Sequence, residues 1–151
     1  MPAVTETDVE FFGPEWAERA RAAVDAGPDE ALRETKLPTY WNWIDGVRGT
    51  YGESWALGVT GLPGGPRYLK LSWRDGECHA AEITGPDVAA DYVLTGPVEV
   101  WRELLGGADP GRIVMYRRLR LTSGNVLGFF RGIYFFVESL AAVARVPAAL
   151  P

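Results

Sequence analysis

The sequence has little of the chemistry that most metal proteins and nucleophilic enzymes require. Its 151 residues include one cysteine, Cys78, and one histidine, His79. A single cysteine cannot form a disulfide within the chain, and it excludes a zinc cluster built on cysteines. The motifs of a hydrolase nucleophile elbow, a phosphate-binding loop and a dinucleotide-binding loop are missing; the glycine-rich stretch 61–66 lacks the lysine and the following helix. The sequence therefore predicts no metal site, and it contains no known catalytic motif.

Positive charge is also scarce. The chain has 15 Lys and Arg against 20 Asp and Glu, a net charge of −5. Proteins that bind nucleic acid normally carry an excess of basic residues, so no nucleic-acid partner is expected. One local exception is a group of arginines within nine residues: Arg112, Arg117, Arg118 and Arg120. We interpret it as a solvated strand face, with a contact for an anionic ligand head group as the alternative.

No apolar run is long enough to cross a membrane. The most apolar segment, 124–145, is interrupted by Arg131 and Glu138, whereas a transmembrane helix needs about 20 apolar residues. Residues 1–12 are acidic and lack the basic-then-apolar order of a signal peptide. A cytoplasmic protein without a transmembrane segment is expected.

Aromatic residues are abundant, with six Trp, six Tyr and six Phe. They suit the lining of a pocket or an interface, and they suit a solid aromatic core equally well. The densest group lies in 124–145, which we expect to form one helix. Counted at 100° per residue, one arc of that helix collects Val126, Phe129, Phe130, Ile133, Phe136, Val137 and Leu140. Gly128 and Gly132 fall off this arc, beside Phe135 and Ser139, and would let the N-terminal helices or a second subunit approach.

The order of elements predicts an α+β fold, an antiparallel sheet of about five strands covered by helices. Pro14 and Gly27 bracket a first helix, and a shorter helical piece ends at Pro38. Strand patterns begin near Tyr40, with Trp41 and Trp43 two residues apart. The later expected elements are strands at 55–61, 68–73, 78–84 and 90–96, a helix at 98–105, and a strand from 116. We divide the chain into an N-terminal helical extension, residues 1–39, packed on a core domain, residues 40–151.

Residues 40–143 resemble the sterol carrier protein 2 family, most closely over 91–125. In that family a strand beginning with aspartate leads to a helix whose end carries two leucines, a glycine and then Asp-Pro, and afterwards to a basic, alternating strand. The matching residues here are Asp91, Val93, Leu94, Leu104, Leu105, Gly106, Asp109, Pro110, Met115, Arg118, Leu119, Arg120, Leu121, Gly124 and Asn125. Arg117 departs from the family, which often has glycine at that position.

The resemblance implies an apolar tunnel between sheet and helices that binds a hydrophobic small molecule, such as a sterol-, fatty-acyl- or polyketide-like compound, without a cofactor. Our leading interpretation is a non-catalytic carrier, and the choice between carrier and enzyme stays open. The aromatic and apolar residues of the sequence supply the candidate walls: Trp43, Trp55, Trp73, Met115, Phe129, Phe130, Ile133 and Phe136.

Two alternatives remain open at this point. The first is a cofactor-free cyclase or isomerase that acts on a hydrophobic biosynthetic intermediate, orienting one flexible substrate and moving one proton. Its candidate groups are Asp91, Tyr92, His79 and Tyr134. His79 cannot act with Cys78 or Glu82 on a strand, because those pairs point to opposite faces. The second is an interaction module whose aromatic helix docks on a partner or on its own copy, which allows a homodimer.

Overall fold

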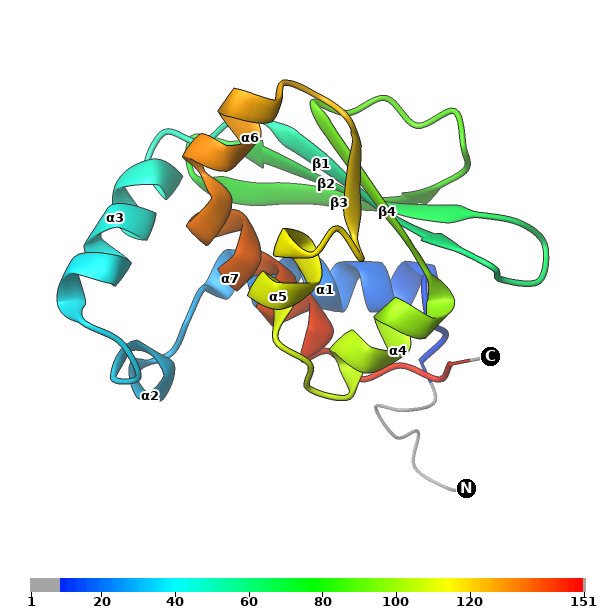
Figure 1. Ribbon diagram of the computed structural model, residues 1–151, viewed down its shortest axis with the longest axis horizontal. Coiled ribbons are helices and arrows are strands. Elements are labelled where there is room, and N and C mark those ends of the chain that lie inside the picture. Colours follow the sequence, from blue (N-terminus) through cyan, green and yellow to red (C-terminus); the bar gives the residue numbers. More distant parts are fainter. Residues whose placement is uncertain (1–8, 151) are drawn as a thin grey trace.

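The computed structural model describes residues 9–150. Figure 1 shows a twisted sheet with most of the helices gathered on one side of it. The chain begins with α1 (Pro14–Ala26), α2 (Glu30–Arg33) and α3 (Pro38–Arg48), and continues through β1 (Ser54–Thr60), β2 (Arg67–Arg74) and β3 (Glu77–Thr84). The second half consists of β4 (Tyr92–Pro97), α4 (Val98–Leu105), α5 (Pro110–Met115), β5 (Arg120–Ser123), α6 (Val126–Arg131) and α7 (Ile133–Ala144). Residues 1–8 of the predicted N-terminal extension lie outside the described residues, and its boundary at residue 39 stays a prediction.

The α+β prediction is confirmed, but the sheet is mixed and not fully antiparallel. The strand order is β3-β2-β1-β4-β5. The pairs β1–β2, β2–β3 and β4–β5 are antiparallel, whereas β1 and β4 run parallel, with Trp55 opposite Tyr92 and Leu57 opposite Leu94. The reason is topological. After the β1–β2–β3 meander, residues 85–91 return the chain to the free side of β1, where β4 starts at the same end as β1.

The helix-facing side of the sheet carries the core. Strand side chains alternate between faces, and on the inner face of β1 both Trp55 and Leu57 are about 1% exposed. α7 packs behind them, and the Phe136 ring centroid lies 5.1 Å from that of Trp55. Burying side chains of this size contributes about 1.5–3 kcal/mol each. α7 also contacts α1, α3, α4 and α5, so it is the central helix of the covering layer.

The strand expected near Tyr40 is wrong, because this segment is α3. Pro38 lies at the first turn of the helix, where its missing N–H and fixed φ are tolerated. Trp41 and Ile44 are buried on the inner helix face three residues apart, while Trp43 points to solvent and is 59% exposed. Trp41 and Trp43, although two residues apart, therefore do not lie on one face of a strand.

The single terminal helix expected over 124–145 is broken at Gly132 into α6 and α7. The break changes the orientation of α7 relative to α6. Residues that were counted onto one face of a continuous helix therefore do not share a face. Phe135 and Ser139 are buried, whereas Val126 and Phe130 are exposed. The elements that pack closely against Gly128 and Gly132 are β4 and α3, respectively. A Cβ on Gly128 would lie 2.6 Å from Tyr92 Oη, and one on Gly132 would lie 3.5 Å from Val47 Cγ1.

The β3 edge of the sheet is closed by α1. Arg21 Nη1 donates to the Cys78 carbonyl at 2.9 Å, and the Cys78 N–H donates to Asp25 Oδ1 at 3.0 Å. Arg48 ties α1 to the β2–β3 hairpin, since it donates to the Asp25 carbonyl at 2.6 Å and to the Gly76 carbonyl at 2.8 Å. Edge strands expose unpaired backbone groups, and here side chains of α1 bond those of Cys78.

Across residues 9–150, no helix combines the length and the apolar character needed to cross a membrane.

Candidate functional site

An apolar cavity lies between the end of the sheet and the helices α5 and α6, and we call it the β5–α6 cavity. It has a volume of about 160 Å³. One wall comes from the sheet strands β4 and β5, and the other from α5, α6 and the segment that follows α5. Its lining residues are Leu94, Val114, Arg117, Leu119, Arg120, Leu121, Val126, Phe129 and Phe130.

Local sequence signals position the helical wall. Asp109 caps α5 by accepting a hydrogen bond from the Gly111 N–H at 3.1 Å, and Pro110 occupies its first turn. Asn125 caps α6 in the same way, accepting from the Gly128 N–H at 2.8 Å. Asparagine and aspartate are preferred N-caps because their short side chains satisfy a free backbone N–H. Gly124, with φ at +122°, makes the turn from β5 into α6, a conformation that other residues rarely adopt.

α6 lies directly on β4. The Tyr92 hydroxyl occupies the space that a side chain at position 128 would need. Tyr92 is 4% exposed, and burial raises the pKa of its hydroxyl to about 12. Its ring lies 5.5 Å from the ring of Phe129, the one residue of α6 that is fully buried. Phe129, which lines the cavity and contacts Phe136, therefore lies between the cavity and the aromatic core.

Two guanidinium groups mark the opening of the cavity. Arg117 and Arg120 line it and are exposed. Within residues 9–150, neither guanidinium takes part in an ion pair or hydrogen bond with a side chain. Arg118 differs, because it donates to Glu103 Oε1 at 2.7 Å and lowers the pKa of that carboxyl. The opening thus presents two charged donors beside apolar walls, an arrangement suited to an apolar ligand with an anionic or polar end.

The predicted wall residues divide between the cavity, the core and the surface. Phe129 and Phe130 line the β5–α6 cavity. Trp55, Trp73 and Phe136 belong to a packed aromatic cluster with Phe135, in which Trp73 and Phe135 have ring centroids 4.9 Å apart. Ile133 is half-buried at the start of α7, and Met115 and Trp43 are exposed. Only the phenylalanines of α6 are thus brought to the cavity.

The aliphatic lining of the cavity was not predicted, because aromatic side chains dominate the sequence pattern. Leu94, Val114 and Leu119 were not among the predicted wall residues, although all three are buried. The signal that could have identified one of them is the alternation of Arg118 and Arg120 with Leu119 and Leu121. In an extended segment that pattern turns one apolar face inward.

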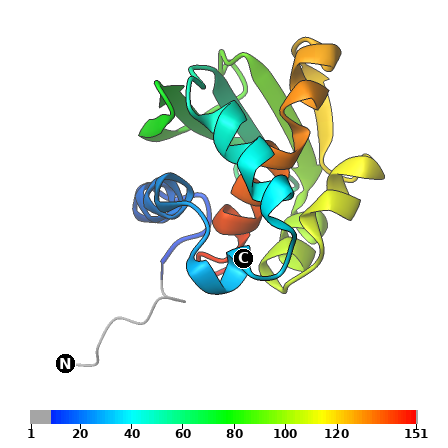
Figure 2. The same cartoon turned by 90° about the vertical axis from the view of Figure 1, so that its left-hand side faces the viewer.

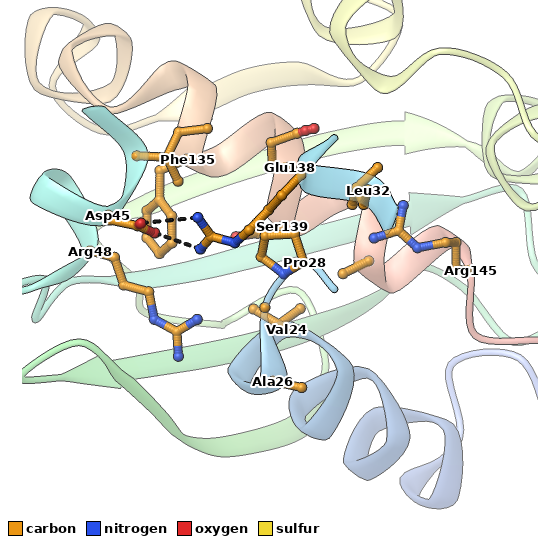
Figure 3. Close-up of a pocket in the computed structure, with 14 residues that line it drawn as sticks. Val24, Ala26, Pro28, Leu32, Asp45, Arg48, Phe135, Glu138, Ser139 and Arg145 are labelled. Carbon is orange, nitrogen blue, oxygen red and sulfur yellow. Dashed lines mark hydrogen bonds and ion pairs between the residues drawn. The ribbon is translucent and has the colours of Figure 1, made fainter. Parts of the chain in front are cut away.

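A second hollow, between α2, α3 and α7, is small and charged. Figure 3 shows the side chains around it, including Asp45 with two dashed interactions. The partner of Asp45 is Arg33, whose guanidinium donates to its two carboxylate oxygens at 2.9 and 3.1 Å. Glu138 is largely buried on its wall, and Glu138 Oε1 lies 3.6 Å from Lys36 Nζ. Glu138 Oε2 has no hydrogen-bond partner among the described residues. A volume of about 70 Å³ with this lining suits water molecules and not a lipid chain.

A third hollow is a shallow, open groove between α3 and α7. Trp43 and Tyr134 line it together with Lys36, Leu37, Thr39 and Tyr40. The rings of Tyr40 and Tyr134 lie 5.6 Å apart, and Lys36 Nζ lies 4.4 Å from the centroid of the Tyr40 ring. Trp43 is thus on a different surface from the β5–α6 cavity.

The four catalytic candidates do not converge. His79 is exposed on β3, which β2 and β1 separate from β4. Asp91 links the starts of β4 and β1, accepting hydrogen bonds from Ser54 N–H at 2.8 Å and Ser54 Oγ at 3.1 Å. Tyr92 is buried under α6, and Tyr134 lies in the α3–α7 groove. The structure therefore brings together no acid–base pair from this set.

The fold has known counterparts among solved structures. A crystal structure of sterol carrier protein 2 superposes with a TM-score of 0.70 at 21% identity, covering 91% of this chain and 99% of that one. The solution structure of a conserved hypothetical protein of Thermus thermophilus, described as possibly a sterol carrier protein, gives 0.68 at 22% identity, covering 96% and 94%. No protein-family model and no curated protein matches the sequence. At these identities the likeness establishes architecture alone: the chain has the fold of sterol carrier protein 2.

Proposed function

We propose that this protein binds a hydrophobic small molecule between its sheet and helices, with the β5–α6 cavity as the site of uptake, and carries it in the cytoplasm. The observation on which the proposal rests is a cavity with apolar walls from both layers and two unpaired guanidinium groups at its opening. Each 100 Å² of ligand surface buried there would contribute about 2.5 kcal/mol. A sterol-, fatty-acyl- or polyketide-like ligand meets these requirements.

α6 would act as the movable wall of the site. The cavity of about 160 Å³ is smaller than the roughly 300–1,000 Å³ of typical ligand pockets, so a lipid needs more room than the structure shows. α6 is six residues long, lies between Gly124 and Gly132, and buries only Phe129. Outward movement of α6 would part the Phe129 and Phe136 rings, whose centroids are 4.9 Å apart. The ligand could then extend from the cavity towards the aromatic core.

The contacts support a carrier over a cofactor-free cyclase or isomerase. Such a reaction needs a proton donor or acceptor within reach of the substrate. None of the four candidates lines the β5–α6 cavity. Tyr92, the one packed beside α6, is buried beneath Gly128 and Phe129. Size-exclusion chromatography would address the remaining alternative, a homodimer formed through the aromatic helices.

The proposal is tested by native mass spectrometry of delipidated protein incubated with oleic acid or with cholesterol. We expect a one-to-one complex with at least one of the two ligands. Leu121→Trp fills the cavity from the β5 side and should weaken binding by at least tenfold. The matched control is Leu37→Trp, an equally large change at a side chain that is 75% exposed in the α3–α7 groove, which should leave binding unchanged.

Two outcomes would overturn the proposal. One is wild-type protein that takes up neither ligand and gives no change in tryptophan fluorescence with either. The other is equal binding by wild-type protein, Leu121→Trp and Leu37→Trp, because that would place the ligand outside the cavity. Circular dichroism on each variant would verify that it is folded.

A further inference from the structure

Positive charge and exposed apolar side chains coincide on one side of this acidic molecule. Residues 112–131 contain five arginines and no aspartate or glutamate, although the whole chain has a net charge of −5. This segment forms the end of α5, β5 and α6, which lie together along one side in Figure 2, away from α1. We call this surface the basic edge and define it by its exposed residues Arg112, Met115, Tyr116, Arg117, Arg120, Val126, Leu127, Phe130 and Arg131.

The apolar residues of the basic edge are exposed far beyond what a folded core requires. Leu127 is 78% exposed, Tyr116 71% and Met115 64%. Val126 and Phe130 are also exposed and line the opening of the β5–α6 cavity. Single exposed apolar residues are ordinary, but several on neighbouring segments mark a surface that binds a partner.

The arginines decide which partner fits. Arg118 is paired with Glu103, while Arg117 and Arg120 have no acidic partner within the described part of the chain. Unpaired guanidinium groups interleaved with leucine, phenylalanine, tyrosine and methionine match an interface of anionic head groups above acyl chains. A nucleic acid would satisfy the charges but would leave the aliphatic side chains against phosphate.

We propose that the basic edge docks on the surface of anionic lipid membranes. Leu127 and Phe130 would enter the head-group layer, and the surrounding arginines would contact lipid phosphates. In this orientation the opening of the β5–α6 cavity faces the bilayer. The docking does not depend on ligand uptake, and so this inference extends beyond the proposed function and can fail separately from it.

The test is co-sedimentation of delipidated protein with vesicles of phosphatidylcholine alone or with about 30% phosphatidylglycerol, which supplies the anionic surface. We expect binding to the anionic vesicles, weakened at about 0.5 M NaCl by screening, and little binding to phosphatidylcholine. Removing the charges of Arg117 and Arg120 together, as R117Q/R120Q, should reduce the partition coefficient by about 25-fold, since each basic residue near the surface contributes about fivefold. The apolar variant L127S should also reduce it.

Matched controls separate the basic edge from a general effect of charge or exposure. Arg19→Gln, on α1, removes a partly exposed arginine that pairs with Glu15, and Leu37→Ser removes an apolar side chain as exposed as Leu127. Both should bind as wild type does. The inference is overturned if anionic vesicles bind no better than neutral ones, or if the control variants lose as much binding as the edge variants. It is also overturned if tRNA or polyglutamate binds the edge while vesicles do not.

Combining the two tests distinguishes the two proposals. Protein that binds anionic vesicles but takes up neither oleic acid nor cholesterol would support docking and contradict the carrier function. Protein that takes up a ligand but ignores anionic vesicles would support the carrier function and contradict docking.

Discussion

The two edges of the sheet differ in how they are covered. At the β3 edge, α1 covers the strand and its side chains bond both backbone groups of Cys78. At the β5 edge, the last strand has four residues, and α5 and α6 beside it leave large apolar side chains in solvent. Closing an edge protects the fold, whereas an exposed apolar edge has a cost that a binding role would explain. With the functions proposed above, the β3 side of the sheet serves stability and the β5 side serves binding.

Burial explains why the two edges should differ in stability. α1 buries Trp16, Ala17, Ala20 and Val24 along one face, and Trp16 stacks on Phe12 with ring centroids 4.8 Å apart. α6 buries one residue. Local opening is cheapest where few apolar contacts are lost, so α6 should open more readily than α1.

The largest expected effect is the loss of the α1 anchor. Trp16 is 0% exposed, and its indole N–H donates to the Val146 carbonyl at 3.3 Å. Trp16→Ala should lower the free energy of unfolding by about 3–5 kcal/mol, because the cavity left behind adds to the lost transfer energy. Phe130→Ala on the basic edge should cost less than about 1 kcal/mol. Urea unfolding followed by far-ultraviolet circular dichroism measures both, and equal losses would contradict the contrast between the edges.

A smaller effect is expected from the hydrogen bonds that close the β3 edge. Asp25→Ala removes the acceptor of the Cys78 N–H and one partner of Arg48. Leaving such groups unsatisfied should cost about 1–2 kcal/mol of unfolding free energy. Asp45→Ala is the matched control, because it removes a carboxylate that pairs with Arg33 at a more exposed site and should cost at most about 1 kcal/mol. If the two variants lose the same stability, the α1 network contributes no more than a surface ion pair.

Parts of the fold were predictable because local chemistry and tertiary packing agree there. The strands expected at 68–73 and 78–84 are β2 and β3, and the Asp75-Gly76 pair between them forms the turn with positive φ at both residues. The helix expected at 98–105 is α4, which Pro97 and Gly106 bound. At residues 41–43 the local pattern and the packing conflict. Tryptophans two residues apart are typical of a strand, but the segment begins with Pro38 as a helix and buries Trp41 together with Ile44.

The site was less predictable than the fold, for two physical reasons. A break at Gly132 changes the orientation of α7 relative to α6. The spacing of apolar residues along the segment does not indicate this break. The cavity also depends on which aliphatic residues meet between β4, β5 and α5, which is a property of the register, with Leu94 opposite Leu121. Phe129 and Phe130 were correctly placed on a helix of the terminal segment, but whether they contact a ligand stays a prediction.

The smallest expected effect is a pH dependence specific to the closed edge. Cys78 is 1% exposed, and burial raises the pKa of its thiol to about 12, whereas an unfolded thiol titrates near about 8.5. Between these values the unfolded chain loses a proton that the folded chain keeps, so the free energy of unfolding falls as pH rises. From about pH 7.5 to about pH 9 this contribution is below about 1 kcal/mol. Wild-type protein should therefore lose more stability over that interval than Cys78→Ala, in urea unfolding at both pH values.

The comparison isolates one thiol, because the buried tyrosines, including Tyr92, are present in both proteins and titrate at higher pH. Equal losses in the two proteins would mean that the Cys78 thiol is accessible to solvent, and thus that α1 does not close the β3 edge. The basic edge should behave differently over the same interval. Arginine stays protonated below about pH 12, so sedimentation with anionic vesicles should be unchanged across it. A pH step that weakens one edge and leaves the other unaltered would separate their roles within a single sample.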